Sequence, residues 1–183
     1  KRIKALQNVK WPLYAGKAET GIRILKDAIS LAASNHKAKA KFYEGLGTLE
    51  LRNGDLAEAE EQFETAIRHS EKCDCDRSRL QIYLRMASLE AQKGNFKKQK
   101  AWLDKVQTDP ATKNHKYIQA AAISETGIMY GFQGIHKKSI PLFRKSLAIQ
   151  KQLKDLPSIA FEQESLARAF YNSGQGDSSY YWY

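Results

Sequence analysis

The chain has 183 residues and a formal net charge of +10. Hydrophobic residues make up 42% of it and aromatic residues 10%, which excludes a disordered chain because such chains lack the apolar surface to build a core. Its longest small-apolar stretch, residues 120–123, is far shorter than the roughly 18 residues that cross a bilayer, so we expect no membrane insertion in this segment. The chain begins without Met, and we expect it to be a fragment of a longer protein whose compartment the sequence does not identify.

A glycine recurs every forty residues, at Gly54, Gly94, Gly134 and Gly174. The segments before it read "AKFYEGLGTLELRNG", "LQIYLRMASLEAQKG", "AAAISETGIMYGFQG" and "AFEQESLARAFYNSG". Each has an apolar stripe at helical spacing, and an amphipathic segment follows each of the first three glycines. The sequence therefore predicts helical hairpins that turn at these glycines. An earlier copy begins at Gly16, and Pro12 predicts an irregular first helix before it.

One small residue lies in the apolar stripe of three successive first helices, at Gly47, Ala87 and Gly127. A small side chain lets a neighbouring helix approach closely, so these residues are predicted to lie at helix contacts. We expect Leu at position 47 to overpack the contact and Ala there to be tolerated, because Ala favours the helix over Gly.

The sequence resembles the tetratricopeptide repeat, a helical hairpin of about 34 residues. The resemblance lies in the order of residue types: an apolar residue, Leu-Gly or Leu-Ala, an aromatic residue and the turn glycine, followed by a small residue, Phe and Ala in the second helix. HEAT and armadillo repeats fit the forty-residue period but not the pattern. The resemblance implies an all-α superhelix of stacked antiparallel helix pairs, with nine or ten helices in one array over residues 1–183. The longer repeat is similar to those of bacterial sensor kinases, peptide-regulated bacterial regulators and animal G-protein regulators, and its extra residues are predicted within 67–80 and 106–118. The expected repeats are 1–38, 39–78, 79–118, 119–158 and an incomplete 159–183.

No catalytic motif of recognisable spacing occurs, so neither an enzyme nor a cofactor is expected. Cys73 and Cys75 follow His69 in a connection, but a zinc site usually needs a fourth ligand. We expect two partly exposed thiols there and no metal. The densest lysine clusters lack interleaved aromatic residues, and residues 41–80 are net acidic, so nucleic acid is not an expected partner.

In such an array the first helices line a concave surface, where partners bind. Glu44 and Thr48 stand where a chaperone-tail clamp would need Lys and Asn, which disfavours a cochaperone role. Cations and one large aromatic residue recur at inward positions, which favours an acidic or mixed peptide. The residues that the resemblance places on this surface are Lys41, Glu44, Arg52, Gln81, Arg85, Ser88, Gln92, Ser124, Ile128, Phe132, Arg168 and Asn172.

Two functions stay open. The first is a non-enzymatic module that binds a protein or peptide in the concave groove, as the sensor or scaffold segment of a signalling or regulatory protein. The second is a structural spacer or self-association module with no groove ligand. Cation and aromatic positions in the groove favour the first, because a spacer has no need of them.

Overall fold

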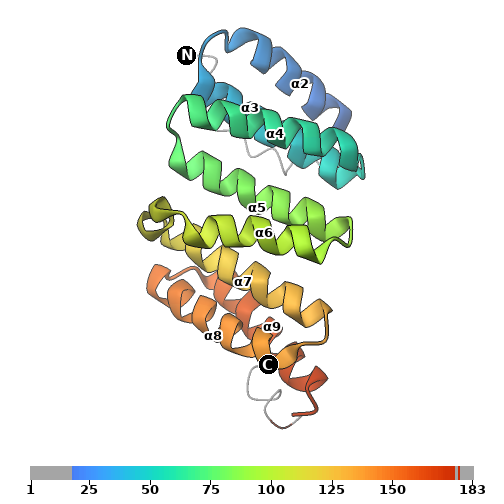
Figure 1. Cartoon of the computed structure of the whole chain (residues 1–183), viewed down its shortest axis with the longest axis vertical. Helices are drawn as coiled ribbons and strands as arrows, with labels where there is room; N and C mark the ends of the chain where they lie inside the picture. The colour runs from blue at the N-terminus through green and yellow to red at the C-terminus, as the bar shows by residue number, and fades with distance from the viewer. Residues whose placement is uncertain (1–17, 176, 178–183) are drawn as a thin grey trace. The chain divides into compact units, whose positions relative to one another are not determined.

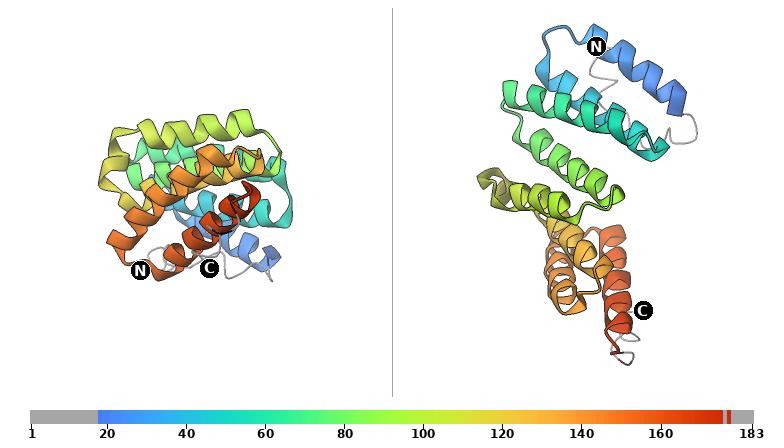
Figure 2. Two further views of the ribbon diagram at one scale, coloured as in Figure 1. Left: turned by 90° about the horizontal axis from the view of Figure 1, so that it is seen from below. Right: turned by 45° about the vertical axis from the view of Figure 1, so that its right-hand side comes forward.

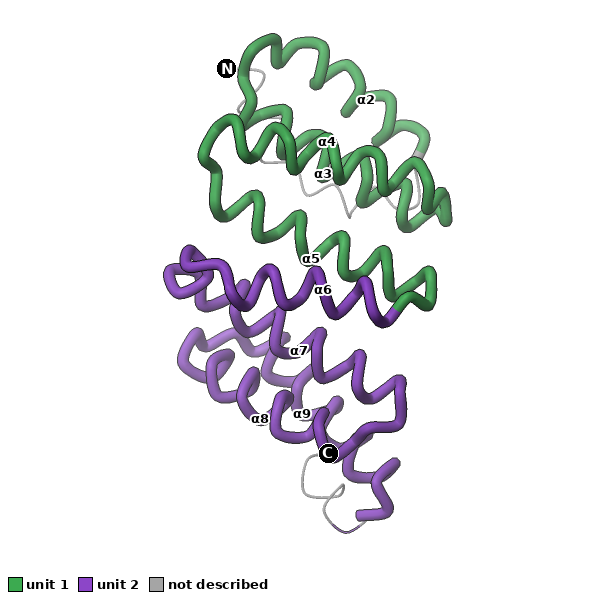
Figure 3. Tube along the Cα trace, in the orientation of Figure 1, with its two compact units in different colours: residues 1–95 green, residues 96–183 purple. Residues whose placement is uncertain are grey.

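The computed structural model describes residues 18–175 and 177, and nearly all of these residues are helical (Figure 1). The chain divides into two compact units, residues 1–95 and residues 96–183 (Figure 3), and each is described by itself. The described residues of unit 1 form four α-helices: α2 (Ala18–Leu31), α3 (His36–Asn53), α4 (Leu56–Lys72) and α5 (Asp76–Gln92). Unit 2 holds α6 (Phe96–Thr108), a short 3-10 helix η2 (Pro110–Asn114), α7 (Lys116–Phe132), α8 (His136–Leu153) and α9 (Leu156–Asn172).

Within each unit every helix packs against the next one along the chain and runs antiparallel to it (Figure 2). First helices of successive hairpins also touch, α3 against α5 in unit 1 and α7 against α9 in unit 2. The predicted all-α fold and its repeated hairpins are therefore confirmed. The expected irregular helix around Pro12 lies outside the described residues, and the single array over the whole chain stays a prediction.

The four periodic glycines form the predicted turns, because each has a positive φ. The φ values of Gly54, Gly94, Gly134 and Gly174 are 92°, 71°, 71° and 77°. This left-handed conformation is open to glycine and costs other residues energy. At the end of α3 the Gly54 amide donates to the carbonyl oxygens of Glu50 and Leu51, so the turn satisfies carbonyls that the helix leaves unpaired.

Two helix pairs meet at a glycine, as the sequence predicts. A Cβ added to Gly47 of α3 would lie 2.8 Å from Cε1 of Phe63 in α4 and 3.1 Å from the carbonyl oxygen of Ala59. A Cβ added to Gly127 of α7 would likewise lie 2.8 Å from Cε1 of Phe143 in α8. Such distances are shorter than carbon contacts allow, so even alanine would displace a buried ring. The expectation that alanine is tolerated at position 47 is wrong.

The extra residues of the forty-residue repeat are accommodated in two ways. In unit 1 they lengthen the second helix, since α4 runs for 17 residues to Lys72. In unit 2 the second helix α6 has 13 residues, and η2 occupies the connection that follows it. The hydroxyl of buried Thr112 in η2 donates to the carbonyl oxygen of Val106, which ties the connection to the end of α6.

Cys73 and Cys75 are joined by a disulfide between α4 and α5, so the expectation of two thiols is wrong. Spacing alone does not reveal whether such a pair is oxidised. His69 lies one turn before this bridge, and its Nδ1 is 2.8 Å from Nδ1 of His36. Burial is the main reason why the pKa of His69 is lowered, and the neighbouring His36 adds to it.

None of the helices in the described part of the chain is both long enough and apolar enough to span a membrane.

Candidate peptide-binding groove

In unit 1 the predicted groove residues lie on α3 and α5, and two of them pair with each other. Arg85 Nε of α5 is 3.6 Å from Glu44 Oε1 of α3. The Glu44 side chain is only 16% exposed, and burial raises its pKa, while the Arg85 guanidinium and Lys41 oppose that rise. Arg85 therefore compensates a carboxylate of its own chain. Because Arg85 already pairs with Glu44, it attracts a carboxylate of a partner less strongly.

The other predicted residues of unit 1 differ in how much of the side chain reaches the surface. Ser88 is half-buried, and its hydroxyl donates to the carbonyl oxygen of Leu84 in its own helix. Thr48 is buried and bonds in the same way to Glu44. Gln81 is also half-buried, whereas three residues are exposed: Lys41, Arg52 and Gln92.

In unit 2 four of the five predicted residues line one pocket. Ile128 and Phe132 come from α7, and Arg168 and Asn172 come from α9. The fifth, Ser124 of α7, is buried and does not line the pocket. The structure thus brings together residues that are forty positions apart in the sequence, because α7 and α9 are the first helices of successive hairpins.

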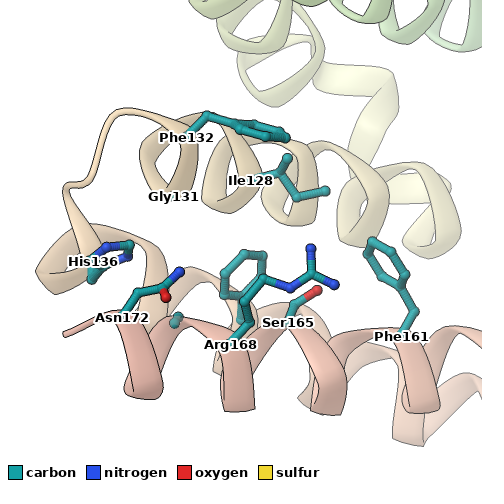
Figure 4. A pocket seen from close by; sticks show the side chains of 10 residues that line it. Ile128, Gly131, Phe132, His136, Phe161, Ser165, Arg168 and Asn172 are labelled. Carbon is teal, nitrogen blue, oxygen red and sulfur yellow. The ribbon is translucent and has the colours of Figure 1, made fainter. Parts of the chain in front are cut away.

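The pocket has a volume of about 360 Å³ and lies between α7 and α9, with α8 contributing to its lining (Figure 4). Small-molecule sites start at about 300 Å³, so the space suits one or two side chains of a partner. Gly131 widens it on the α7 side, since a Cβ built there meets nothing within 4 Å. Its lining residues are Ile128, Gly131, Phe132, His136, Phe143, Phe161, Ser165, Arg168, Ala169 and Asn172.

Two aromatic rings at the rim of this pocket are unusually exposed. Phe132 of α7 is 79% exposed and Phe161 of α9 is 49% exposed, and the rings come from opposite walls (Figure 4). Burying a phenylalanine side chain stabilises a contact by roughly 1.5–3 kcal/mol. A partner segment that covers either ring would therefore gain a substantial part of its binding energy there.

Polar groups accompany the rings on the α9 wall. Arg168 Nη2 donates to Glu164 Oε1 at 2.5 Å, and the two side chains are 66% and 54% exposed. An exposed pair one helical turn apart contributes only about 0.3–0.5 kcal/mol, so a partner carboxylate can compete with Glu164. At the start of α8 the buried Nδ1 of His136 has no hydrogen-bond partner among the described residues.

Sequence reasoning missed Phe161 and Ser165, although their positions carried a signal. Phe161 lies thirteen residues before its turn glycine, as Lys41 and Gln81 do in their copies. Ser165 lies nine residues before Gly174, the offset that Arg85 has from Gly94. Those offsets, applied to the last first helix, would have identified both residues.

The described residues contain no cluster of three or more His, Cys, Asp or Glu side chains placed to hold a metal ion. The arrangement in unit 2 instead provides an apolar pocket with one cation and several hydrogen-bonding groups. Such a lining binds and orients a partner, because apolar contact supplies affinity and the polar groups supply specificity.

The profile of the tetratricopeptide repeat family matches the chain over residues 13–72 and 44–114, which together are more than half of its length. The chain belongs to the tetratricopeptide repeat family. Modules of this family generally bind other proteins, and the match identifies no catalytic family. No curated protein sequence is similar enough to count as a match.

Solved structures share the fold of this tetratricopeptide repeat protein at low sequence identity. BtubC (BKLC) from P. vanneervenii is 14% identical, with a TM-score of 0.80 over 98% of this chain and 75% of that one. A putative kinesin light chain with nearly identical TPR-like repeats from Podosopora anserina is 21% identical, with a TM-score of 0.71 over 99% and 91%. MamA is 19% identical, with a TM-score of 0.61 over 91% and 79%. Likeness at these identities concerns the fold alone.

Proposed function

We propose that this tetratricopeptide repeat module binds a protein segment or peptide in the pocket between α7 and α9, and that it has no catalytic role. The observation that carries the proposal is the pair of exposed rings, Phe132 and Phe161, facing a pocket of about 360 Å³. Large apolar groups exposed around a concave site are a common mark of a binding surface.

The chemistry of the lining favours a partner segment in which an apolar side chain lies close to an acidic one. The apolar side chain occupies the space beside Ile128, and neighbouring parts of the segment cover the two rings. The acidic group takes the place of Glu164 on Arg168, and this charged hydrogen bond exceeds the roughly 0.3–0.5 kcal/mol of the exposed pair only as far as the bound segment excludes water from it. Ser165 and Asn172 supply hydrogen bonds to the segment's backbone, as is usual for a bound extended peptide.

Unit 1 contributes less in this proposal, although its residues belong to the same predicted surface. Arg85 faces Glu44 across α3 and α5, and a partner carboxylate would have to compete with that half-buried group. Within unit 1 the exposed residues Lys41, Arg52 and Gln92 remain proposed contacts for a protein partner.

A binding module of this kind fits the sensor or scaffold segment of a signalling or regulatory protein, which is the wider role that we propose. The support is the forty-residue period of its repeats, which we infer to be similar to the long repeats of bacterial sensor kinases and peptide-regulated regulators; the comparisons with known proteins do not add to this inference. In such a role the bound segment would be recognised here, and its effect would be passed to a flanking domain.

The proposal is tested by selecting ligands for the whole chain from a phage-displayed library of random peptides. We expect enrichment of sequences in which an aromatic or large aliphatic residue lies within a few positions of Asp or Glu. Titration of one enriched peptide then compares Arg168→Glu and Phe132→Ser with two matched controls. Lys97→Glu makes the same charge reversal on exposed α6, and Tyr117→Ser removes an aromatic residue that is 53% exposed at the start of α7.

The pocket variants are expected to weaken binding at least tenfold, which corresponds to about 1.4 kcal/mol, and the controls to leave it unchanged. Equal losses in both sets would show a diffuse charge effect and contradict the pocket. A library that yields no enriched ligand would favour the spacer function instead.

A further inference from the structure

One exposed side of α8 carries three cations, and the helix itself contains no carboxylate. Lys137, Arg144 and Lys151 are all exposed, and no Asp or Glu occurs in the helix. Residues seven apart lie on nearly the same side of a helix, so these three form one stripe. No ion pair with a described residue holds any of them, and Arg144 lies over the ring of Phe170 with 5.4 Å between its Cζ and the ring centre.

The outer face of α4 in unit 1 carries the opposite charge. Glu61, Glu64 and Glu71 are exposed and lie on one side of the helix. No described ion pair holds any of the three. Arg68, whose guanidinium donates to Thr65, lies among them, and the exposed Lys72 follows Glu71. Three carboxylates against two cations leave the stripe with a small net negative charge.

Two of the three positions in each stripe are equivalent in their hairpins. Both α4 and α8 are second helices that begin two residues after a turn glycine. Glu64 and Arg144 each lie ten residues after that glycine, and Glu71 and Lys151 each lie seventeen after it. The same structural position thus carries a carboxylate in one repeat and a cation in another.

We propose that the α8 stripe of one copy of this chain docks on the α4 stripe of a second copy. Charge complementarity between two exposed helices of similar length carries the inference, which does not depend on the groove between α7 and α9. An antiparallel arrangement that places Arg144 opposite Glu64 also brings Lys137 opposite Glu71, because both pairs of residues are seven apart. Glu61 then lies about 6 Å along the helix from the position that faces Lys151, a distance that the long lysine side chain can reach. The contact uses a different surface on each copy, so it can add further copies unless a ring closes.

Association of this kind is weak and salt-dependent. Exposed ion pairs contribute up to about 1 kcal/mol each, and the Debye length shortens to about 3 Å at 1 M salt. Salt therefore weakens the proposed contact. Contact between apolar surfaces has the opposite response, because excluded salts such as sulfate strengthen it.

The experiment is sedimentation velocity of the full chain at high protein concentration, in sodium chloride at about 0.02 M and about 0.5 M, where the Debye lengths differ severalfold. One variant reverses the α8 stripe (K137E, R144E, K151E), and a second reverses the α4 stripe (E61K, E64K, E71K). A third carries both sets of changes and keeps the net charge of the natural chain. Circular dichroism confirms that each variant folds.

The natural chain is expected to associate at low salt and to separate at high salt. Each single-stripe variant stays monomeric, an equal mixture of the two associates, and the doubly reversed chain associates again. A monomeric natural chain at low salt overturns the proposal, and so does a doubly reversed chain that stays monomeric. A natural chain that stays monomeric but binds a duplex RNA probe through α8 would mark a polyanion site and overturn it as well.

Discussion

Gly47 of α3 lies directly against the ring of Phe63 in α4, with room for a hydrogen atom and no room for a methyl group. An added Cβ would be 2.8 Å from Cε1 and 2.9 Å from Cδ1 of that ring. The same relationship joins Gly127 to Phe143 in unit 2. In the copy between them the matching sequence positions hold Ala87 and Leu103, so a larger residue in the first helix accompanies a smaller one in the second.

Gly47→Ala is therefore expected to destabilise the chain by about 1–3 kcal/mol, the usual cost of overpacking a core. Chemical denaturation measures the change. A double-mutant cycle with Phe63→Leu supplies the control, because the smaller side chain makes room for the added methyl group. Phe63→Leu should cost clearly less in the Gly47→Ala background than in the natural chain, and additive effects would contradict the packing.

Helix α8 is bounded by two turns that each contain a residue with positive φ. Removing the glycine from the first turn should destabilise the chain, and introducing a glycine into the second should stabilise it. Gly134 has φ 71° and open space around it, so Gly134→Ala should lose about 1–2 kcal/mol through backbone strain alone. Lys154 holds a similar conformation, with φ 57° at the end of α8. Lys154→Gly should therefore stabilise the chain. Thermal unfolding of the two variants and of the natural chain measures both effects. Destabilisation by both changes would show that the turn at position 154 is not left-handed.

Because of Glu50, the free energy of unfolding is expected to fall as the pH rises. The residue is only 7% exposed, and burial raises its pKa from 4.5 to about 7, with Lys26 opposing the rise and Glu58, Asp55 and Glu61 adding to it. The folded chain holds this proton more tightly than the unfolded chain does, so stability is lost between about pH 4.5 and pH 7.

Glu50→Gln removes that loss, which amounts to up to about 3 kcal/mol at roughly 1.4 kcal/mol per pKa unit. Denaturation midpoints at pH 5 and pH 8 should differ less in this variant than in the natural chain. Glu64→Gln, at an exposed position of the neighbouring helix, is the matched control and should keep the natural pH dependence. An unchanged pH dependence in Glu50→Gln would contradict the assignment.

Arg85→Gln is expected to destabilise unit 1 more at pH 8 than at pH 5. Burial already raises the pKa of Glu44, and loss of the guanidinium raises it further. The charged carboxylate is then uncompensated at high pH, whereas protonation relieves it at low pH. The effect is about 1 kcal/mol or less, because Arg85 is partly exposed and water screens the pair. Equal destabilisation at both pH values would show that Arg85 acts through packing and not through its charge.

Much of the fold could be predicted because each hairpin turn requires a residue with positive φ, and glycine meets that requirement. A residue with positive φ every forty positions, together with a small residue seven positions earlier, determines the hairpin and its closest contact. The disulfide could not be predicted in this way, since two cysteines separated by one residue occur in either redox state. The close helix contact at Gly47 was also predicted. The exclusion of even alanine was not, because it depends on the orientation of the Phe63 ring.

The groove could be predicted only in part. Repeat offsets identified Ile128, Phe132 and Arg168, and they would have identified Phe161 had they been applied to every copy. The pairing of Arg85 with Glu44 connects two first helices, so it depends on the packing of α3 against α5. The contribution of His136 depends similarly on where α8 starts relative to the neighbouring walls. A single helix pattern contains neither relationship.

The most direct test of the groove is an NMR titration of the isotopically labelled chain with one library-selected peptide. Backbone amide and side-chain signals are assigned first, and shifts are then mapped onto the helices. We predict that the largest shifts fall on Ile128, Phe132, Phe161, Arg168 and Asn172, and that the Phe132→Ser variant loses them together. Shifts of equal size on α6, which contributes nothing to the pocket lining, or binding that leaves these five residues unchanged, would contradict the account.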